Sequence, residues 1–120
     1  MTRKWKPLMV ALVCSLPVCS QDNYHTNKAQ EYLRDAEYYT KKAEGYDREA
    51  EYYNKKAQEY MREADYYSRN KKFDKANTYS KWANDAMDKA RMQMRWASDA
   101  RENAHLRMRW AKEAMDKAKK

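Results

Sequence analysis

The stretch AEYYTKKAEGYDRE at residues 36–49 is followed directly by AEYYNKKAQEYMRE at residues 50–63, an imperfect copy of the same 14 residues. In both copies an alanine occupies every seventh position, and a tyrosine follows three residues after each alanine. Apolar side chains at this spacing, in a segment rich in Ala, Glu, Lys and Arg, are typical of long helices and coiled coils. The repeat predicts an all-α protein of long amphipathic helices, with alanine at heptad position a and tyrosine at position d.

The alanine heptads extend in both directions from this stretch. They reach Ala29 upstream and Ala64 downstream, and a second series begins at Ala76 and continues to Ala118. The second series has its own 14-residue unit, in which methionine and tryptophan replace the tyrosines. The side chains expected at the helix–helix interface are Ala29, Tyr32, Ala36, Tyr39, Ala43, Tyr46, Ala50, Tyr53, Ala57, Tyr60, Ala64, Tyr67, Ala76, Ala83, Ala90, Ala97, Ala104 and Ala111.

The two series are out of phase by one irregular step. Ala64 and Ala76 are 12 residues apart, which rotates the alanine stripe by about 120° around a helix. The intervening residues 68–72 are polar, and Asn70 is of a type that tolerates the left-handed conformation at helix ends. The sequence therefore predicts helices at 21–69 and 73–120, joined by a turn at 70–72.

Charge favours folding back at this turn. Residues 21–69 carry 9 basic and 11 acidic side chains, whereas residues 70–120 carry 14 basic and 7 acidic ones. An antiparallel two-helix hairpin would place these opposite net charges side by side. No Gly or Pro marks the turn, so the alternative is one continuous coiled-coil rod with a local phase slip.

Residues 1–20 have the pattern of a signal peptide. Basic side chains at positions 3, 4 and 6 precede a mostly apolar run at 8–18, which is too short to span a membrane. This pattern predicts export, to the periplasm or outer membrane of a Gram-negative bacterium or to the exterior.

Two cleavage routes fit this leader. Cleavage after Ser20 would leave Gln21 as the first residue of the mature chain. Alternatively, LPVC at residues 16–19 is an imperfect lipobox, in which case Cys19 becomes the lipidated first residue and anchors the chain to a membrane.

The rest of the composition excludes several classes of protein. After Cys19 the chain has no Cys, no Pro and a single glycine, Gly45, and it has very little Leu, Ile, Val or Phe. These features exclude a β-rich fold, a disulfide scaffold, a cysteine zinc site and a glycine-rich phosphate loop. No acid pair and no Ser–His–Asp set stands apart from the repeat. We therefore expect no enzymatic activity, no cofactor and no small-molecule substrate.

Two other features suggest ligands, and each has a simpler explanation. Met92, Met94, His105 and Met108 are residue types that suit Cu(I). However, methionine recurs at heptad position e, which favours helix packing and predicts no metal site. The net positive charge of residues 70–120 suggests an anionic partner, but the basic side chains are interleaved with acidic ones. The predicted export argues against nucleic acid as that partner.

The leader ending near Cys19, the alanine heptads and the final stretch RENAHLRMRWAKEAMDKAKK at 101–120 resemble the murein (Braun-type) lipoproteins, the alanine-zipper proteins of Gram-negative outer membranes. In that family the cysteine is triacylated, the helix trimerises and the terminal lysine is joined to peptidoglycan. The resemblance implies that Cys19 is the lipid site and Lys120 the tether. Residues 21–69 depart from the family pattern because tyrosine replaces small side chains at the expected helix–helix interface.

These features together predict an exported structural coiled-coil envelope protein that acts by self-assembly or tethering. Expected partners are further copies of the chain, with membrane lipid or peptidoglycan where the ends are attached. The alternative is a soluble periplasmic or secreted helical module that binds an anionic or apolar partner.

Overall fold

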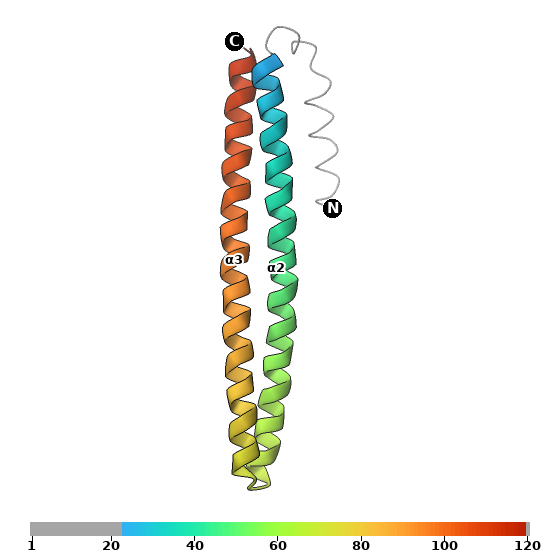
Figure 1. Cartoon of the computed structure of the whole chain (residues 1–120), viewed down its shortest axis with the longest axis vertical. Helices are drawn as coiled ribbons and strands as arrows, with labels where there is room; N and C mark the ends of the chain where they lie inside the picture. The colour runs from blue at the N-terminus through green and yellow to red at the C-terminus, as the bar shows by residue number, and fades with distance from the viewer. Residues whose placement is uncertain (1–22, 120) are drawn as a thin grey trace. The chain divides into compact units, whose positions relative to one another are not determined.

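The computed structural model describes residues 23–119, which form two long helices. Helix α2 spans Asn23–Arg69 and helix α3 spans Phe73–Lys119, each of 47 residues, and no strand occurs in this part of the chain. The helices are antiparallel neighbours, with the chain turning back after the end of α2 (Figure 1). The prediction of an all-α antiparallel hairpin is confirmed, and the alternative of one continuous rod is wrong.

The helix pair divides into two units. The turn unit, Thr40–Arg101, contains the turn and the adjoining parts of both helices. The end unit contains the start of α2 at residues 23–39 and the end of α3 at residues 102–119. Each unit has its own alanine interior and its own layer of aromatic contacts.

The turn is a compact helix cap centred on Lys71. The amide of Lys72 donates to the Tyr67 carbonyl at 2.8 Å, and the amide of Lys71 donates to the Ser68 carbonyl at 3.1 Å. This pair of bonds is the Schellman arrangement, which requires a left-handed residue, and Lys71 has a φ of 60°. Asn70 instead contributes its side chain, which donates to the Tyr66 carbonyl at 2.8 Å.

The interior between the helices is made of alanine. In the turn unit, Ala43, Ala97 and Ala100 form a buried cluster against which Tyr46 packs. No large side chain in the described part of the chain is fully buried. Small side chains at the contact let two helices approach closely, so the seam is narrow. The buried alanines are Ala29, Ala36, Ala43, Ala50, Ala57, Ala76, Ala83, Ala86, Ala90, Ala97, Ala100, Ala104, Ala111 and Ala114.

Tyrosines of α2 meet tryptophans of α3 along one side of this seam. In the turn unit the ring centroids of Tyr46 and Trp96 are 5.7 Å apart, and those of Tyr60 and Trp82 are also 5.7 Å apart. In the end unit Tyr32 and Trp110 are 5.6 Å apart. In all three pairs the two residues lie equally far from Lys71 along the sequence, so both units share one antiparallel register.

Candidate functional site

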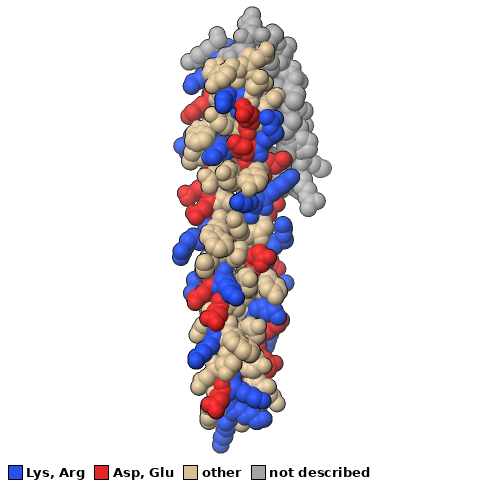
Figure 2. All heavy atoms as spheres, viewed as in Figure 1, with Lys and Arg blue, Asp and Glu red and all other residues tan. Residues whose placement is uncertain are grey.

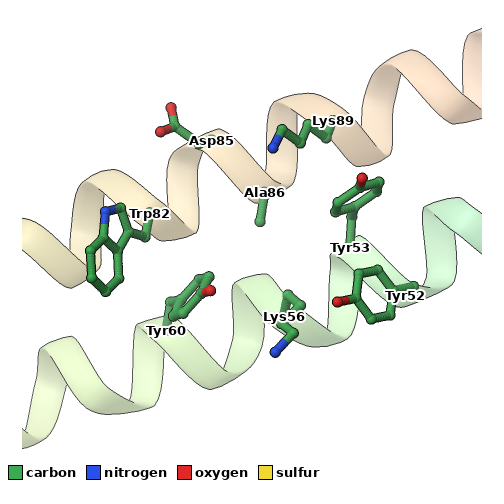
Figure 3. Close-up of a pocket in the computed structure, with 8 residues that line it drawn as sticks. All are labelled: Tyr52, Tyr53, Lys56, Tyr60, Trp82, Asp85, Ala86 and Lys89. Carbon is green, nitrogen blue, oxygen red and sulfur yellow. The ribbon is translucent and has the colours of Figure 1, made fainter.

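A groove in the turn unit lies on the tryptophan side of the seam. It has a volume of about 390 Å³, and α2 and α3 each supply four of its lining residues. These are Tyr52, Tyr53, Lys56 and Tyr60 from α2, and Trp82, Asp85, Ala86 and Lys89 from α3. We call this the turn-unit groove (Figure 3).

The turn-unit groove has aromatic ends, a methyl floor and two cations. Figure 3 shows Tyr60 and Trp82 at one end, Tyr52 and Tyr53 at the other, and Ala86 between the helices. The Lys56 ammonium lies 5.9 Å from the Tyr52 ring centroid, and the Lys89 ammonium lies 5.6 Å from that of Tyr53. The Asp85 carboxylate points away from α2, and the Lys56 ammonium points away from α3 and lies 4.0 Å from the Glu59 carboxylate.

A second groove, in the end unit, has the same construction. Its volume is about 330 Å³, and its lining residues are Tyr24, His25, Lys28, Tyr32, Trp110, Glu113, Ala114 and Lys117. We call this the end-unit groove. Each of its residues is two 14-residue repeats away from its counterpart in the turn-unit groove. Six of the eight positions are identical, and the other two change Tyr53 to His25 and Asp85 to Glu113.

The repeat between these two carries a different residue at one position. Asn103 stands where Lys89 and Lys117 stand in the repeats on either side. In the end unit Tyr39 is instead covered by Arg107, whose guanidinium carbon lies 5.2 Å from the Tyr39 ring centroid and 4.8 Å from that of Trp110. The lysine at this heptad position is therefore not required for the two helices to pack.

Charges along the hairpin are mixed in sign. On the face drawn in Figure 2, basic and acidic side chains alternate with uncharged ones, and no broad area carries a single sign. Ion pairs join the helices within each unit, from Arg101 to Asp47 in the turn unit and from Arg107 Nε to Asp35, 3.9 Å apart, in the end unit. In both pairs α3 supplies the cation, in keeping with its net positive charge.

The opposite side of the seam, at heptad position e, carries methionines. Met61 and Met94 in the turn unit and Met108 in the end unit are each more than two-fifths exposed. We call these three side chains the methionine flank. Their exposure means that they do not fill the interior of one hairpin, whereas Met87 and Met115, at the same heptad position, are half-buried.

The residues predicted at the helix–helix interface lie in two layers in the structure. The alanines are buried, except Ala64 next to the turn, which is half-buried. Tyr32, Tyr39, Tyr46, Tyr53, Tyr60 and Tyr67 are all half-buried and cover the alanine seam. Cys19 and Lys120 lie outside the described residues.

Sequence reasoning missed three interface positions. Ala86, Ala100 and Ala114 are buried at heptad position d of α3, where the heptad scheme had assigned no residue. The signal was present, because each follows three residues after an alanine at position a. These small residues leave the space into which tyrosines of α2 lean, as Tyr46 does beside Ala100.

The described residues offer little chemistry of other kinds. They contain no cluster of three or more His, Cys, Asp or Glu side chains placed to hold a metal ion. A hydrogen bond from Arg69 to Asp65, and the charge of that carboxylate, raise the pKa of the arginine, which is protonated in any case. Neither helix, over the residues described, has a stretch long and apolar enough to cross a membrane.

No protein-family model, curated protein or solved structure matches this chain.

Proposed function

We propose that this chain is an exported structural protein of a bacterial envelope, which acts by self-association of helical hairpins. The observation that carries the proposal is the distribution of apolar side chains. The hairpin buries alanines and leaves tyrosine, tryptophan and methionine side chains exposed on its surface. Exposed apolar surface of this kind marks a site of association, and a thin two-helix unit gains stability from it.

The methionine flank is the surface that best fits this role. Met61 and Met94 in the turn unit, and Met108 in the end unit, lie at heptad position e, on the other flank of the alanine stripe from the groove of the same unit. Their flexible thioethers adapt to a facing copy of the same surface. Two such flanks in contact would remove large apolar side chains from water. At about 25 cal/mol per Å² of apolar area removed from water, a few buried methionines contribute several kcal/mol.

The hairpin favours assembly over a tether stretched along the chain. Tyr24, at the start of α2, and Lys117, near the end of α3, line the same groove. The start of α2 and the end of α3 therefore belong to one unit, whereas a tether stretched along the chain needs its two attachment points far apart. In our proposal lipidation at Cys19 fixes the assembly to a membrane, and Lys120 has no tethering role.

Sedimentation equilibrium of the mature protein, over micromolar to millimolar concentrations, tests self-association. We expect oligomers that dissociate on dilution and are weakened when Met61, Met94 and Met108 are all changed to Gln, a polar residue of similar length. The control changes Met92 and Leu106 to Gln, since both are exposed but lie at heptad position c. A wild-type chain that stays monomeric at the highest concentration would overturn the proposal.

The intact mass of the protein from its native host tests export and anchoring. Loss of residues 1–20 with no added mass indicates the soluble route, whereas acyl chains on Cys19 indicate the lipid-anchored one. Membrane fractionation of the Cys19→Ala variant gives the matching comparison. A mature chain that retains the leader would contradict export.

A further inference from the structure

We propose that two copies of the hairpin associate in a two-fold arrangement, with α2 of one copy against α3 of the other, and that Asp47 and Arg101 decide which surface is accepted as a partner. This inference rests on the proposed self-association and assigns its geometry and its specificity. It concerns the side chains at heptad position e of the turn unit, which we call the e face. They are Thr40, Asp47, Asn54, Met61, Ser68, Phe73, Ser80, Met87, Met94 and Arg101.

The e face has little charge, although the chain as a whole is highly charged. Charged residues make up 37% of the sequence, yet eight of the ten side chains of the e face are uncharged. On the other flank of the alanine stripe, six of the eight side chains at position g in the helices of the same unit are charged: Lys42, Glu49, Lys56, Glu63, Lys75 and Lys89. A solvated helix face normally carries charged side chains, so their scarcity on one flank indicates a surface that another protein covers.

The largest side chains of the e face are exposed. Phe73, Met94 and Met61 are 59%, 55% and 53% exposed. A single hairpin therefore leaves this face only partly covered. A facing surface of the same character would remove these apolar side chains from water, which favours association.

The two charged side chains of the e face form an ion pair with each other. Arg101 of α3 donates to the carboxylate of Asp47 of α2, and the two side chains are 51% and 44% exposed. The pair has no net charge, but it presents a cation and an anion side by side. Such a surface is complementary to a second copy of itself, because a two-fold rotation that brings α2 over α3 places each charge opposite one of the other sign.

The register set by this ion pair extends the match towards the turn. One heptad from the pair, Asn54 of α2 lies level with Met94 of α3, and one heptad further Met61 lies level with Met87. When two copies lie with their turns at the same end, each of these levels meets its own copy. The result is a four-helix bundle in which every neighbouring pair of helices is antiparallel.

Net charge favours the same orientation. Residues 21–69 carry 9 basic and 11 acidic side chains, whereas residues 70–120 carry 14 basic and 7 acidic ones. Placing α2 of one copy against α3 of the other brings opposite net charges together, whereas placing α3 against α3 would bring two positive helices together.

The test mixes copies that should reject each other. In the swapped chain, Asp47→Arg and Arg101→Asp exchange the two charges, so the pair within the hairpin is kept. Against the wild type, however, arginine faces arginine and aspartate faces aspartate. Native mass spectrometry of isotope-labelled wild type mixed with unlabelled swapped chain counts the mixed and unmixed dimers. We expect mixed dimers to be about tenfold below their statistical share, because like charges repel across the contact.

The control exchanges an ion pair on the other flank. Lys56→Glu with Glu59→Lys reverses a pair whose charged atoms are 4.0 Å apart, at positions g and c. This chain should mix with the wild type in statistical proportions. Far-UV circular dichroism checks that each variant is helical, and Asp47→Lys with Arg101→Glu replaces the swapped chain if it is not.

Single cysteines test the orientation of the two copies. Mixed under oxidising conditions, an Asn54→Cys chain and a Met94→Cys chain should form a disulfide with each other faster than either does with itself. The reason is that positions 54 and 94 face each other across the proposed contact. No cysteine follows Cys19 in the natural sequence, so the introduced thiols are the only ones in the helices. Faster disulfides between two chains of one kind would contradict this orientation.

Two outcomes would overturn the inference and leave self-association standing: statistical mixing of the wild type with the swapped chain, and equal exclusion of the control chain. A helical swapped chain that does not associate with itself would also overturn it, because its e face is as self-complementary as that of the wild type. A wild type that stays monomeric at the highest concentration is a different failure, since it removes the proposed function on which the inference rests.

Discussion

Lys71 occupies the backbone position on which the hairpin turn depends. Its φ of 60° lies in the left-handed region, which costs a residue with a Cβ about 1–2 kcal/mol. The Schellman bonds from Lys71 and Lys72 to carbonyls near the end of α2 offset this cost. Glycine is the usual residue at this place, and its absence is why the sequence left the turn in doubt.

Changing Lys71 to Gly should raise the free energy of unfolding by about 1 kcal/mol, since glycine adopts the left-handed conformation without steric cost. Urea denaturation followed by circular dichroism measures the change. Lys72→Gly is the matched control, because Lys72 has no positive φ and should gain nothing. A loss of stability in Lys71→Gly would show that the turn does not adopt this conformation.

Gly45 is the single weak position within α2. Its φ is not positive, and a Cβ added there would meet only the Arg48 guanidinium, 4.0 Å away. Gly45→Ala should therefore stabilise the chain by about 1 kcal/mol, the difference in helix propensity between the two residues. Thermal denaturation checks this, with Gln58→Ala as an exposed comparison expected to change stability by less than about 0.5 kcal/mol. A destabilised Gly45→Ala chain would mean that the glycine permits a contact which a methyl group blocks.

At the level of the helices, the alanine seam sets how closely α2 and α3 approach. Ala97 is 0% exposed and packs in the cluster with Ala43 and Ala100. A larger side chain there has no cavity to fill, so the helices would have to separate. The periodicity of the sequence predicts this seam because each alanine stripe depends only on local helix geometry.

Ala97→Leu should lower the free energy of unfolding by about 1–3 kcal/mol through overpacking. Ser98→Leu adds the same side chain at the next, exposed position and should be close to neutral. Denaturant titrations of the two variants give the comparison. Equal stability of the two would show that the helices are not in close contact at Ala97.

The periodicity of either helix did not predict which side of the alanine seam carries the aromatic contacts between the helices. Heptad position e gathers methionines and position g gathers tryptophans and lysines, but a repeat does not state which of these two flanking positions contacts side chains of the other helix. The antiparallel register brings Trp82 opposite Tyr60 and Lys89 over Tyr53. Those contacts join residues far apart in the sequence, so no local pattern contains them.

At the scale of the molecule, the hairpin brings the start of α2 and the end of α3 into one unit. Spin labels at positions 24 and 116, both exposed and both in the end unit, should show strong intramolecular dipolar coupling. Dilution with unlabelled protein removes coupling between copies and is the necessary control. Weak coupling in the diluted sample would mean that the helix ends are far apart and that the chain does not fold back.

Local sequence is enough to make this protein helical, because alanine heptads and the near absence of Gly and Pro act within a few residues. It also determined which stripe of each helix is buried, since that stripe follows from the helical period. The position of the fold-back at Lys71 depends on the folded backbone, because a left-handed lysine is stabilised by bonds that form after α2 ends. The tertiary structure likewise decided that Tyr, Trp and Lys side chains from two distant repeats meet in two similar grooves, since this depends on the register between the helices.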